Sequence, residues 1–239
     1  MQAPQRPRPP RLILLSPGEL EPSGLLAFER EVAAVALLLE RRGALDVGLL
    51  LRETALEDRV FLELFTGLRR RHGALPLGIH DRAHLAALAE RSRAARGLDE
   101  PHGPPRVGLE RPWLHLAARS LAPGQVRALL PAACLGFSWH AGQTLPDPQA
   151  LDYVCLSPLG AVPSKGPPLG IAGLAQGCRR TALPVWALGG VDENAAAEIF
   201  AAGAAGAMVG RAWRSALAAG RLEALLAAFG GGAGAPGRS

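Results

Sequence analysis

The stretch from Leu183 to Ala212, LPVWALGGVDENAAAEIFAAGAAGAMVGRA, predicts a buried strand, a glycine turn, a helix and a second buried strand. The first strand, up to Leu188, is short, apolar and bounded by proline and glycine, as expected of a strand covered on both faces. Asp192 can cap the helix that follows, and Gly203 can end it. The second strand ends at Gly210. This order is typical of a barrel of parallel strands and helices.

Gly189 and Gly190 follow the first of these strands, and Gly210 and Arg211 follow the second. Glycine has no Cβ, so backbone N–H groups there can closely approach an anion. In many (β/α)8 barrels the loops after strands 7 and 8 bind a phosphate in this way. A plainer explanation is that the small residues only allow helix and strand to pack closely. We expect a phosphate site formed by these four residues.

The rest of the chain supports one domain of this kind. A length of 239 residues and a hydrophobic content of 49% suit a single α/β barrel with one core. Eight strand candidates alternate with helical segments, which favours a closed parallel barrel over an open sheet. The strand candidates are 11–15, 47–51, 75–79, 113–116, 134–137, 153–156, 184–188 and 207–209, and the long helix candidates are 24–42, 56–71, 83–95, 193–202 and 213–229.

The ends and one internal segment lack the pattern of a packed core. We expect a disordered tail over 1–10, a barrel over 11–229 with a surface loop at 97–112, and a flexible glycine-rich tail over 230–239. The segment 141–151 contains Pro146 and Pro148, which would interrupt a full helix.

Composition excludes several classes of function. No apolar run approaches the ~18 residues of a membrane span, and the N-terminus lacks the apolar core of a secretory signal. The net charge is +5, but the basic residues are dispersed, so nucleic-acid binding is not expected. Three scattered cysteines suit reduced thiols. We expect a cytoplasmic protein that binds a small molecule and could form a homodimer.

Polar residues follow several strand candidates, at the edge of a barrel where active sites lie. Each has a plainer explanation: Asp81 could cap a helix, Arg52 could form an ion pair, Ser138 could be a turn residue, and His80 could be a hydrogen-bonding rim residue. His115 ends an apolar strand and is expected to be packed. The candidate site residues at this edge are Arg52, His80, Asp81, Ser138, His140 and Lys165.

Lys165 is the one lysine among 26 basic residues. A chain that otherwise uses arginine therefore keeps a compact ammonium at this position. The planar fork of arginine does not replace a point charge beside a phosphate or carboxylate, although chance could also leave a single lysine. The composition thus adds weight to Lys165 as a binding residue.

Several motifs together resemble the thiamine-phosphate synthase and thiazole tautomerase superfamily. The strongest are LDYVCLSPLGAVPSKGPPLGIAGL at 151–174, ALGGV at 187–191 and AAGAAGAMVGRA at 201–212. LLLRET, GIHDRAHLA, LHLAARSLAP and LGFSWHA are similar to further segments of the family. The resemblance covers the chain from the first strand to the eighth and implies the same barrel fold.

The resemblance implies two possible enzymes. A synthase joins a pyrimidine diphosphate to thiazole phosphate and holds Mg²⁺ with two aspartates. Asp81 matches the first aspartate, whereas Ser120 stands at the second position, and a hydroxyl is a poorer ligand for this cation. Thr54 also replaces a lysine of the family pattern. The synthase, with Mg²⁺ on Asp81, is therefore the second choice.

A thiazole tautomerase needs no metal, because it aromatises carboxylated thiazole phosphate by a proton shift. His140 stands at the family's acid/base position, and an imidazole changes charge near neutral pH. Ser138 would assist it, Arg52 and Lys165 would face the carboxylate or phosphate, and Gly189, Gly190, Gly210 and Arg211 would hold the phosphate. We expect this activity. The chain could instead be a paralogue that binds such a ligand without turnover or, more distantly, a phosphate-binding barrel of amino-acid biosynthesis.

Overall fold

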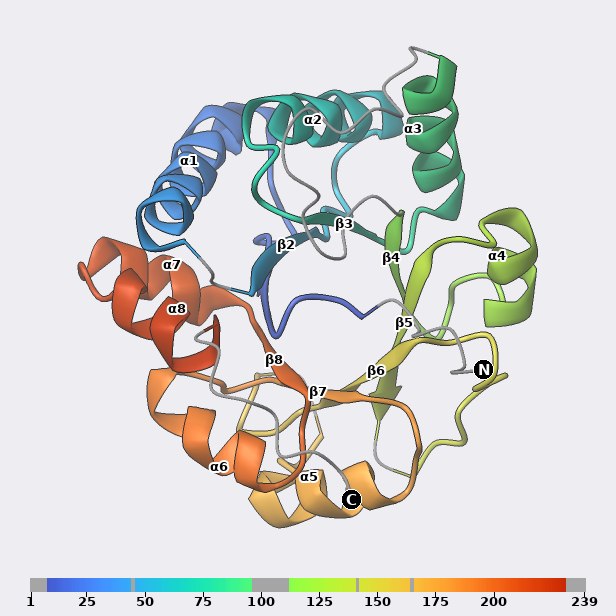
Figure 1. The fold of residues 1–239 in the computed structure, drawn as a ribbon, viewed down its shortest axis with the longest axis vertical. Coiled ribbons are helices and arrows are strands. Elements are labelled where there is room, and N and C mark those ends of the chain that lie inside the picture. The colour runs from blue at the N-terminus through green and yellow to red at the C-terminus, as the bar shows by residue number, and fades with distance from the viewer. Residues whose placement is uncertain (1–7, 44–45, 96–111, 141, 164–165, 231–239) are drawn as a thin grey trace.

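The computed structural model describes residues 8–43, 46–95, 112–140, 142–163 and 166–230. Their eight parallel strands close into a barrel in chain order, because β1 pairs with both β2 and β8 (Figure 1). This confirms the predicted (β/α)8 fold. The strands are β1 Leu12–Leu15, β2 Val47–Leu51, β3 Leu77–His80, β4 Trp113–Leu116, β5 Cys134–His140, β6 Tyr153–Ser157, β7 Val185–Leu188 and β8 Gly206–Val209.

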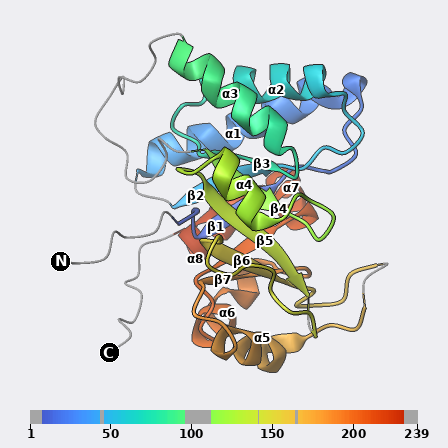
Figure 2. The same cartoon turned by 90° about the vertical axis from the view of Figure 1, so that its right-hand side faces the viewer.

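Helices surround the barrel, as the two views in Figures 1 and 2 show. Each packs an apolar face on the sheet, as α1 does with Phe28, Val32 and Val35. No helix in the described part of the chain is long and apolar enough to cross a membrane. The helices are α1 Leu25–Arg42, α2 Asp58–Arg71, α3 Ala83–Ala95, α4 Pro123–Leu129, α5 Gly170–Arg179, α6 Ala196–Ala201, α7 Arg211–Ala218 and α8 Leu222–Gly230, with short 3₁₀ turns at Pro22–Gly24 and Glu193–Ala195.

Two connections differ from a regular alternation of strands and helices. The described residues 142–152, between β5 and β6, contain no helix, in agreement with the two prolines there. The single final helix predicted over 213–229 is wrong, because α7 ends at Ala218 and α8 begins at Leu222. Gly220 has a φ of 68°, a left-handed conformation that ends the first helix.

The segment that suggested the fold has the predicted order of elements. β7 and β8 are neighbours, with Leu188 beside Met208 in the register. Asp192 Oδ1 accepts a hydrogen bond of 3.0 Å from Asn194 N, so it caps the helix as predicted. The first turn is 3₁₀, and α6 follows it directly.

Side chains of the strands divide into two cores, because successive residues point to opposite faces of a sheet. One core lies between the sheet and the helices. The other fills the inside of the barrel and consists of Ile13, Leu50, Trp113, Cys134, Tyr153, Cys155, Trp186 and Met208.

Large aromatic rings inside the barrel lie against glycines of neighbouring strands. A Cβ at Gly136 would come within 2.0 Å of Tyr153 Cζ, and one at Gly78 within 2.5 Å of Trp113 Cδ2. Gly206 makes the corresponding space for Trp186. The interior below the open end of the barrel is therefore filled by rings that fit only because the opposing positions lack side chains.

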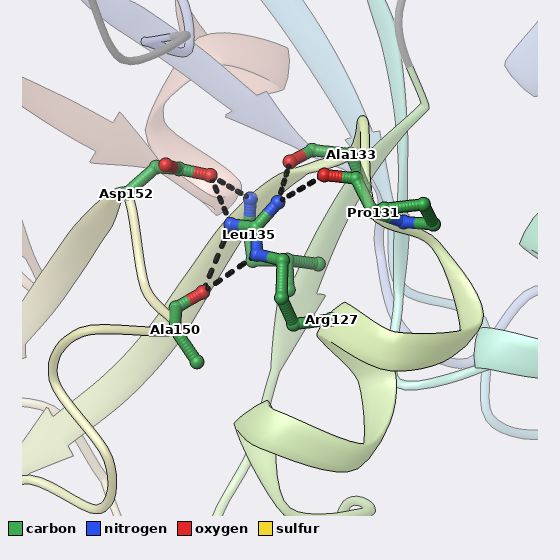
Figure 3. A network of polar contacts seen from close by, with 6 residues as sticks. All are labelled: Arg127, Pro131, Ala133, Leu135, Ala150 and Asp152. Atoms are coloured by element: carbon green, nitrogen blue, oxygen red, sulfur yellow. Dashed lines mark hydrogen bonds and ion pairs between the residues drawn. The ribbon is translucent and has the colours of Figure 1, made fainter.

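The N-terminal ends of β5 and β6 are joined by a partly buried polar network centred on Arg127 of α4 (Figure 3). Its guanidinium lies 2.7 Å from Asp152 Oδ2 and donates to the carbonyl oxygens of Ala133 and Ala150. The same carboxylate oxygen of Asp152 accepts from Leu135 N at 2.9 Å. One arginine thus satisfies polar groups of several segments at the end of the barrel opposite the candidate residues.

We expect Arg127→Ala to lower the free energy of unfolding by about 3 kcal/mol, because it removes the cation paired with the buried Asp152 carboxylate and the donor to two carbonyl oxygens. Arg127→Lys keeps the charge but loses the fork and should recover only part of this loss. Urea unfolding followed by circular dichroism measures both. An unchanged midpoint in Arg127→Ala would contradict the role of the network.

We also expect Gly136→Ala to destabilise the fold by about 3 kcal/mol, because the new methyl group would overlap the Tyr153 ring. Gly73→Ala is the matched control, since the nearest atom there, Arg69 O, lies 3.8 Å from the new Cβ. Thermal melts of the two variants should differ by several degrees, with Gly136→Ala the lower.

Candidate functional site

The carboxyl ends of the eight strands form one open end of the barrel, which we call the mouth. Strand pairing fixes the order of the candidate residues around it. Arg52 follows β2, His80 ends β3, Ser138 and His140 lie on β5, and the glycine turn follows β7. Lys165 lies outside the described residues, so its predicted role stays a prediction.

Ser138 and His140 lie within β5, so the prediction that they follow the strand is wrong. β5 extends because His140 still pairs with Ser157 of β6. Alternation turns Ser138 and His140 to the inside of the barrel, while Trp139 belongs to the outer core. Trp139 Nε1 donates to Gln143 O at 2.9 Å, and its ring lies under the guanidinium of Arg180. The outward tryptophan thereby fixes the inward orientation of its two neighbours.

The imidazole of His140 is held by Ser157 across the β5–β6 pair. His140 Nδ1 lies 3.2 Å from both the carbonyl oxygen and the Oγ of Ser157. Because a carbonyl oxygen can only accept, the tautomer that fits both contacts carries its hydrogen on Nδ1. Nε2 then keeps its lone pair and can act as a base.

His80 and His115 lie side by side, with ring centroids 5.7 Å apart. Burial and then the charge of Arg52 lower the pKa of His80 from its ordinary 6.5 to about 4. Burial lowers the pKa of His115 well below its ordinary value. Both rings are therefore neutral at pH 7 and add no positive charge to the mouth. Arg52 itself is exposed, as a guanidinium that meets an anion would be.

Asp81 has a φ of 64°, and its carboxylate faces the end of β4. Ser120 Oγ donates to Asp81 Oδ1, and Arg119 Nε lies 3.6 Å from Asp81 Oδ2. Among the described residues, the Asp81 carboxylate therefore contacts the side chains of Ser120 and Arg119 instead of capping a helix. The two positions at which the resemblance implies a pair of metal-binding aspartates do meet, but as a carboxylate and a hydroxyl.

These residues offer magnesium one carboxylate where the family pattern has two. Mg²⁺ prefers carboxylate and water oxygens in an octahedral arrangement, and here the one carboxylate already has a serine and an arginine against it. Among the residues that the structure describes, no three histidine, cysteine, aspartate or glutamate side chains gather closely enough to hold a metal ion.

The structural constraints on Gly189 and Gly190 differ from those on Gly210. Gly189 and Gly190 have φ angles of 98° and 68°, and a Cβ at Gly190 would lie 2.9 Å from Gly160 Cα. Backbone conformation and packing therefore both require small residues there. Gly210 has a φ of −86°, and a Cβ on it would meet no described protein atom within 4 Å. Packing therefore does not require a small residue at Gly210, and the space beside it leaves the N-terminus of α7 and the exposed Arg211 open to a ligand.

Besides Ser157, two buried groups that shape the mouth were not predicted as site residues. The carboxylate of Glu53 accepts from Gly18 N at 2.9 Å and Leu20 N at 2.7 Å, so it anchors the loop after β1, and no local pattern marks it. His115 was expected to be packed, and it is 2% exposed, but its Nε2 also lies 3.0 Å from Ser138 Oγ. Its position two residues after Trp113 placed it inside the barrel and was the available signal.

The fold and the site define a (β/α)8-barrel protein whose mouth carries polar side chains and exposed arginines. The sequence pattern of the thiamine monophosphate synthase family matches residues 41–213. A putative thiamine-phosphate synthase of Geobacter sulfurreducens is 34% identical over 191 residues, covering 76% of this chain and 81% of that protein. A thiamine-phosphate synthase of Thermobifida fusca is 31% identical over 181 residues, 71% of this chain and 72% of that protein.

A solved structure of thiamine phosphate pyrophosphorylase from Pyrococcus furiosus has the same fold, with a TM-score of 0.65, 17% identity, and coverage of 92% of this chain and 93% of that one. The chain belongs to the thiamine monophosphate synthase family, an enzyme family of thiamine biosynthesis.

We expect Gly210→Ala to leave stability unchanged and to weaken the binding of inorganic phosphate roughly ten-fold, because a methyl group would stand where the anion approaches the backbone amides. Gly73→Ala, before β3 at the opposite end of the barrel, is the control. Phosphate titration followed by amide NMR shifts of residues 189–191 and 210–212 measures both. Equal affinity in the two variants would argue against the site.

Proposed function

We propose that this protein is a metal-independent thiazole tautomerase, which aromatises carboxylated thiazole phosphate by moving one proton. The observation that carries the proposal is the contact between His140 Nδ1 and the Ser157 carbonyl oxygen, because a neutral ring that donates from Nδ1 has its lone pair on Nε2 and can use it as a base. The reaction needs one acid/base group, one phosphate site and a cation for the carboxylate.

The proton transfer uses a single residue in two steps. Nε2 of His140 takes a proton from the substrate, and the ring becomes an imidazolium. The carbonyl and hydroxyl oxygens of Ser157 accept from Nδ1–H and stabilise the positive charge. Nε2 then returns the proton at the second position, so the substrate gains its aromatic ring and the enzyme is unchanged.

The remaining groups would bind and orient the substrate. The amides after β7 and at the start of α7 are suited to the phosphate, as argued for Gly210. Arg52 and Arg211 are exposed cations available to the carboxylate and the phosphate. Lys165 is proposed for the same role from the sequence. Ser138 lies on the same face of β5 as His140 and two residues before it, within reach of the same ligand.

The second candidate is a thiamine-phosphate synthase, favoured by the names of the relatives. That reaction would bring a diphosphate and Mg²⁺ to the ends of β3 and β4. The pairing of Asp81 with Ser120 and Arg119 supports the tautomerase instead, because a hydroxyl stands at the position of the second carboxylate and is a poorer ligand for this metal.

Two assays separate the candidates. The purified protein is incubated with the non-aromatic carboxylated thiazole phosphate, and aromatisation is followed by absorbance. Pyrimidine diphosphate, thiazole phosphate and Mg²⁺ are then supplied, and thiamine phosphate is sought. Product in the first assay alone supports the tautomerase. Product in the second identifies a synthase, and product in neither, with ligand binding retained, identifies a binding paralogue.

We expect His140→Gln to reduce aromatisation at least about 100-fold, because glutamine cannot carry the proton, while affinity for the aromatic phosphorylated product changes little. His84→Gln on the exposed face of α3 is the matched control and should keep full turnover. Unchanged turnover in His140→Gln would refute the assignment.

A further inference from the structure

A chain of polar contacts runs inside the barrel from β4 to the mouth. Trp113 Nε1 donates to the Tyr153 hydroxyl at 2.9 Å, and that oxygen lies 2.9 Å from His115 Nδ1. His115 Nε2 lies 3.0 Å from Ser138 Oγ. Trp113, Tyr153 and His115 are each at most 4% exposed, whereas Ser138 is half-buried at the mouth. The buried members therefore connect to the ligand region through Ser138.

One assignment of the hydrogen atoms gives every donor in this chain of contacts an acceptor. An indole N–H can only donate, so the Tyr153 oxygen is the acceptor from Trp113. The Tyr153 hydroxyl can then donate to His115 Nδ1. The His115 ring is neutral and carries one hydrogen, which must be on Nε2 when Nδ1 accepts. Nε2–H donates to Ser138 Oγ, and the Ser138 hydrogen remains for a ligand.

The opposite tautomer of His115 gives a different site. With hydrogen on Nδ1, the Tyr153 oxygen would accept from both Trp113 and His115, and its own hydrogen would turn away from both rings. Ser138 would then donate its hydrogen to His115 Nε2 and could only accept from a ligand. The tautomer of His115 thus decides the polarity of Ser138, by which we mean whether its hydroxyl can donate a hydrogen bond to a ligand or only accept one.

We propose that Trp113, Tyr153 and His115 are positioning residues that hold Ser138 as a hydrogen-bond donor, so that the subsite beside it takes an acceptor atom such as a carboxylate oxygen. The identity of that ligand rests on the proposed function, whereas the polarity of Ser138 does not. Ser138 would fix the substrate's acceptor next to His140, since both side chains project from the same face of β5.

The first test reads the tautomer directly and needs no substrate. Long-range ¹H–¹⁵N NMR of the full chain with labelled histidine distinguishes Nδ1–H from Nε2–H rings, and the His115 signal is assigned by replacing the remaining histidines one at a time. We expect His115 to be the Nε2–H form, and Tyr153→Phe to shift it toward Nδ1–H. An Nδ1–H ring in the unaltered protein overturns the proposal.

The second test asks whether Tyr153 acts through Ser138. Binding of the aromatic carboxylated thiazole phosphate is measured by calorimetry in Tyr153→Phe, Ser138→Ala and the double variant. We expect each single change to weaken binding roughly ten-fold, and the double variant to be no weaker than Ser138→Ala alone. Two effects that multiply would mean that Tyr153 contributes packing only, which contradicts the proposal.

Trp186→Phe is the matched control. Trp186 also packs against Tyr153, at 5.2 Å between ring centroids, but its N–H donates to Pro10 O at the opposite end of the barrel. The change should lower thermal stability and leave both affinity and the His115 tautomer unchanged. If neither the unaltered protein nor any variant binds the ligand while His115 is Nε2–H, the proposed function fails and the polarity of Ser138 is supported.

Discussion

The pairing of β1 with β8 closes the barrel, and this closure assembles the mouth. Leu12, Ile13 and Leu14 pair with residues of β8, and the remaining strands follow each other in chain order around the sheet. Closure brings the carboxyl ends of β2, β3, β5 and β7 around one opening, although they are far apart in the sequence. Trp213 of α7 reinforces the seam, because its Nε1 donates to Leu15 O at 2.8 Å.

Side chains must fill the interior of a closed barrel, and here the same side chains also determine the hydrogen bonding of Ser138. Rings placed against glycines occupy the space below the mouth, and each carries a polar atom that needs a partner. Trp186 finds its partner in Pro10 O at the opposite end of the barrel, and Trp113 finds its partner in the Tyr153 oxygen. His115 supplies the partner of the Tyr153 hydroxyl and passes the hydrogen-bonding direction to Ser138. Packing and the polarity of the site are therefore linked through the same buried residues.

The mouth combines an oriented imidazole with two neutral histidine rings and one paired carboxylate. His140 is oriented by Ser157, and the neutral rings of His80 and His115 line the inner wall without adding charge. At the ends of β3 and β4, a serine and an arginine engage the carboxylate that a metal would need. The glycine turn after β7 and the pair of Asp81 and Ser120 lie on different strands, so a sequence change at one need not alter the other.

Local sequence patterns were enough to predict the barrel, since strand patterning and the glycine-bounded ends of β7 and β8 are signals within short segments. They also indicated which strand ends carry Arg52, Asp81 and His140. The folded chain was needed to show that β5 continues through His140, that Asp81 is engaged by Arg119 and Ser120, and that His115 bonds Ser138. Each of these depends on a partner from another strand or its following loop, and contacts across strands are set by register and closure, which no local pattern encodes.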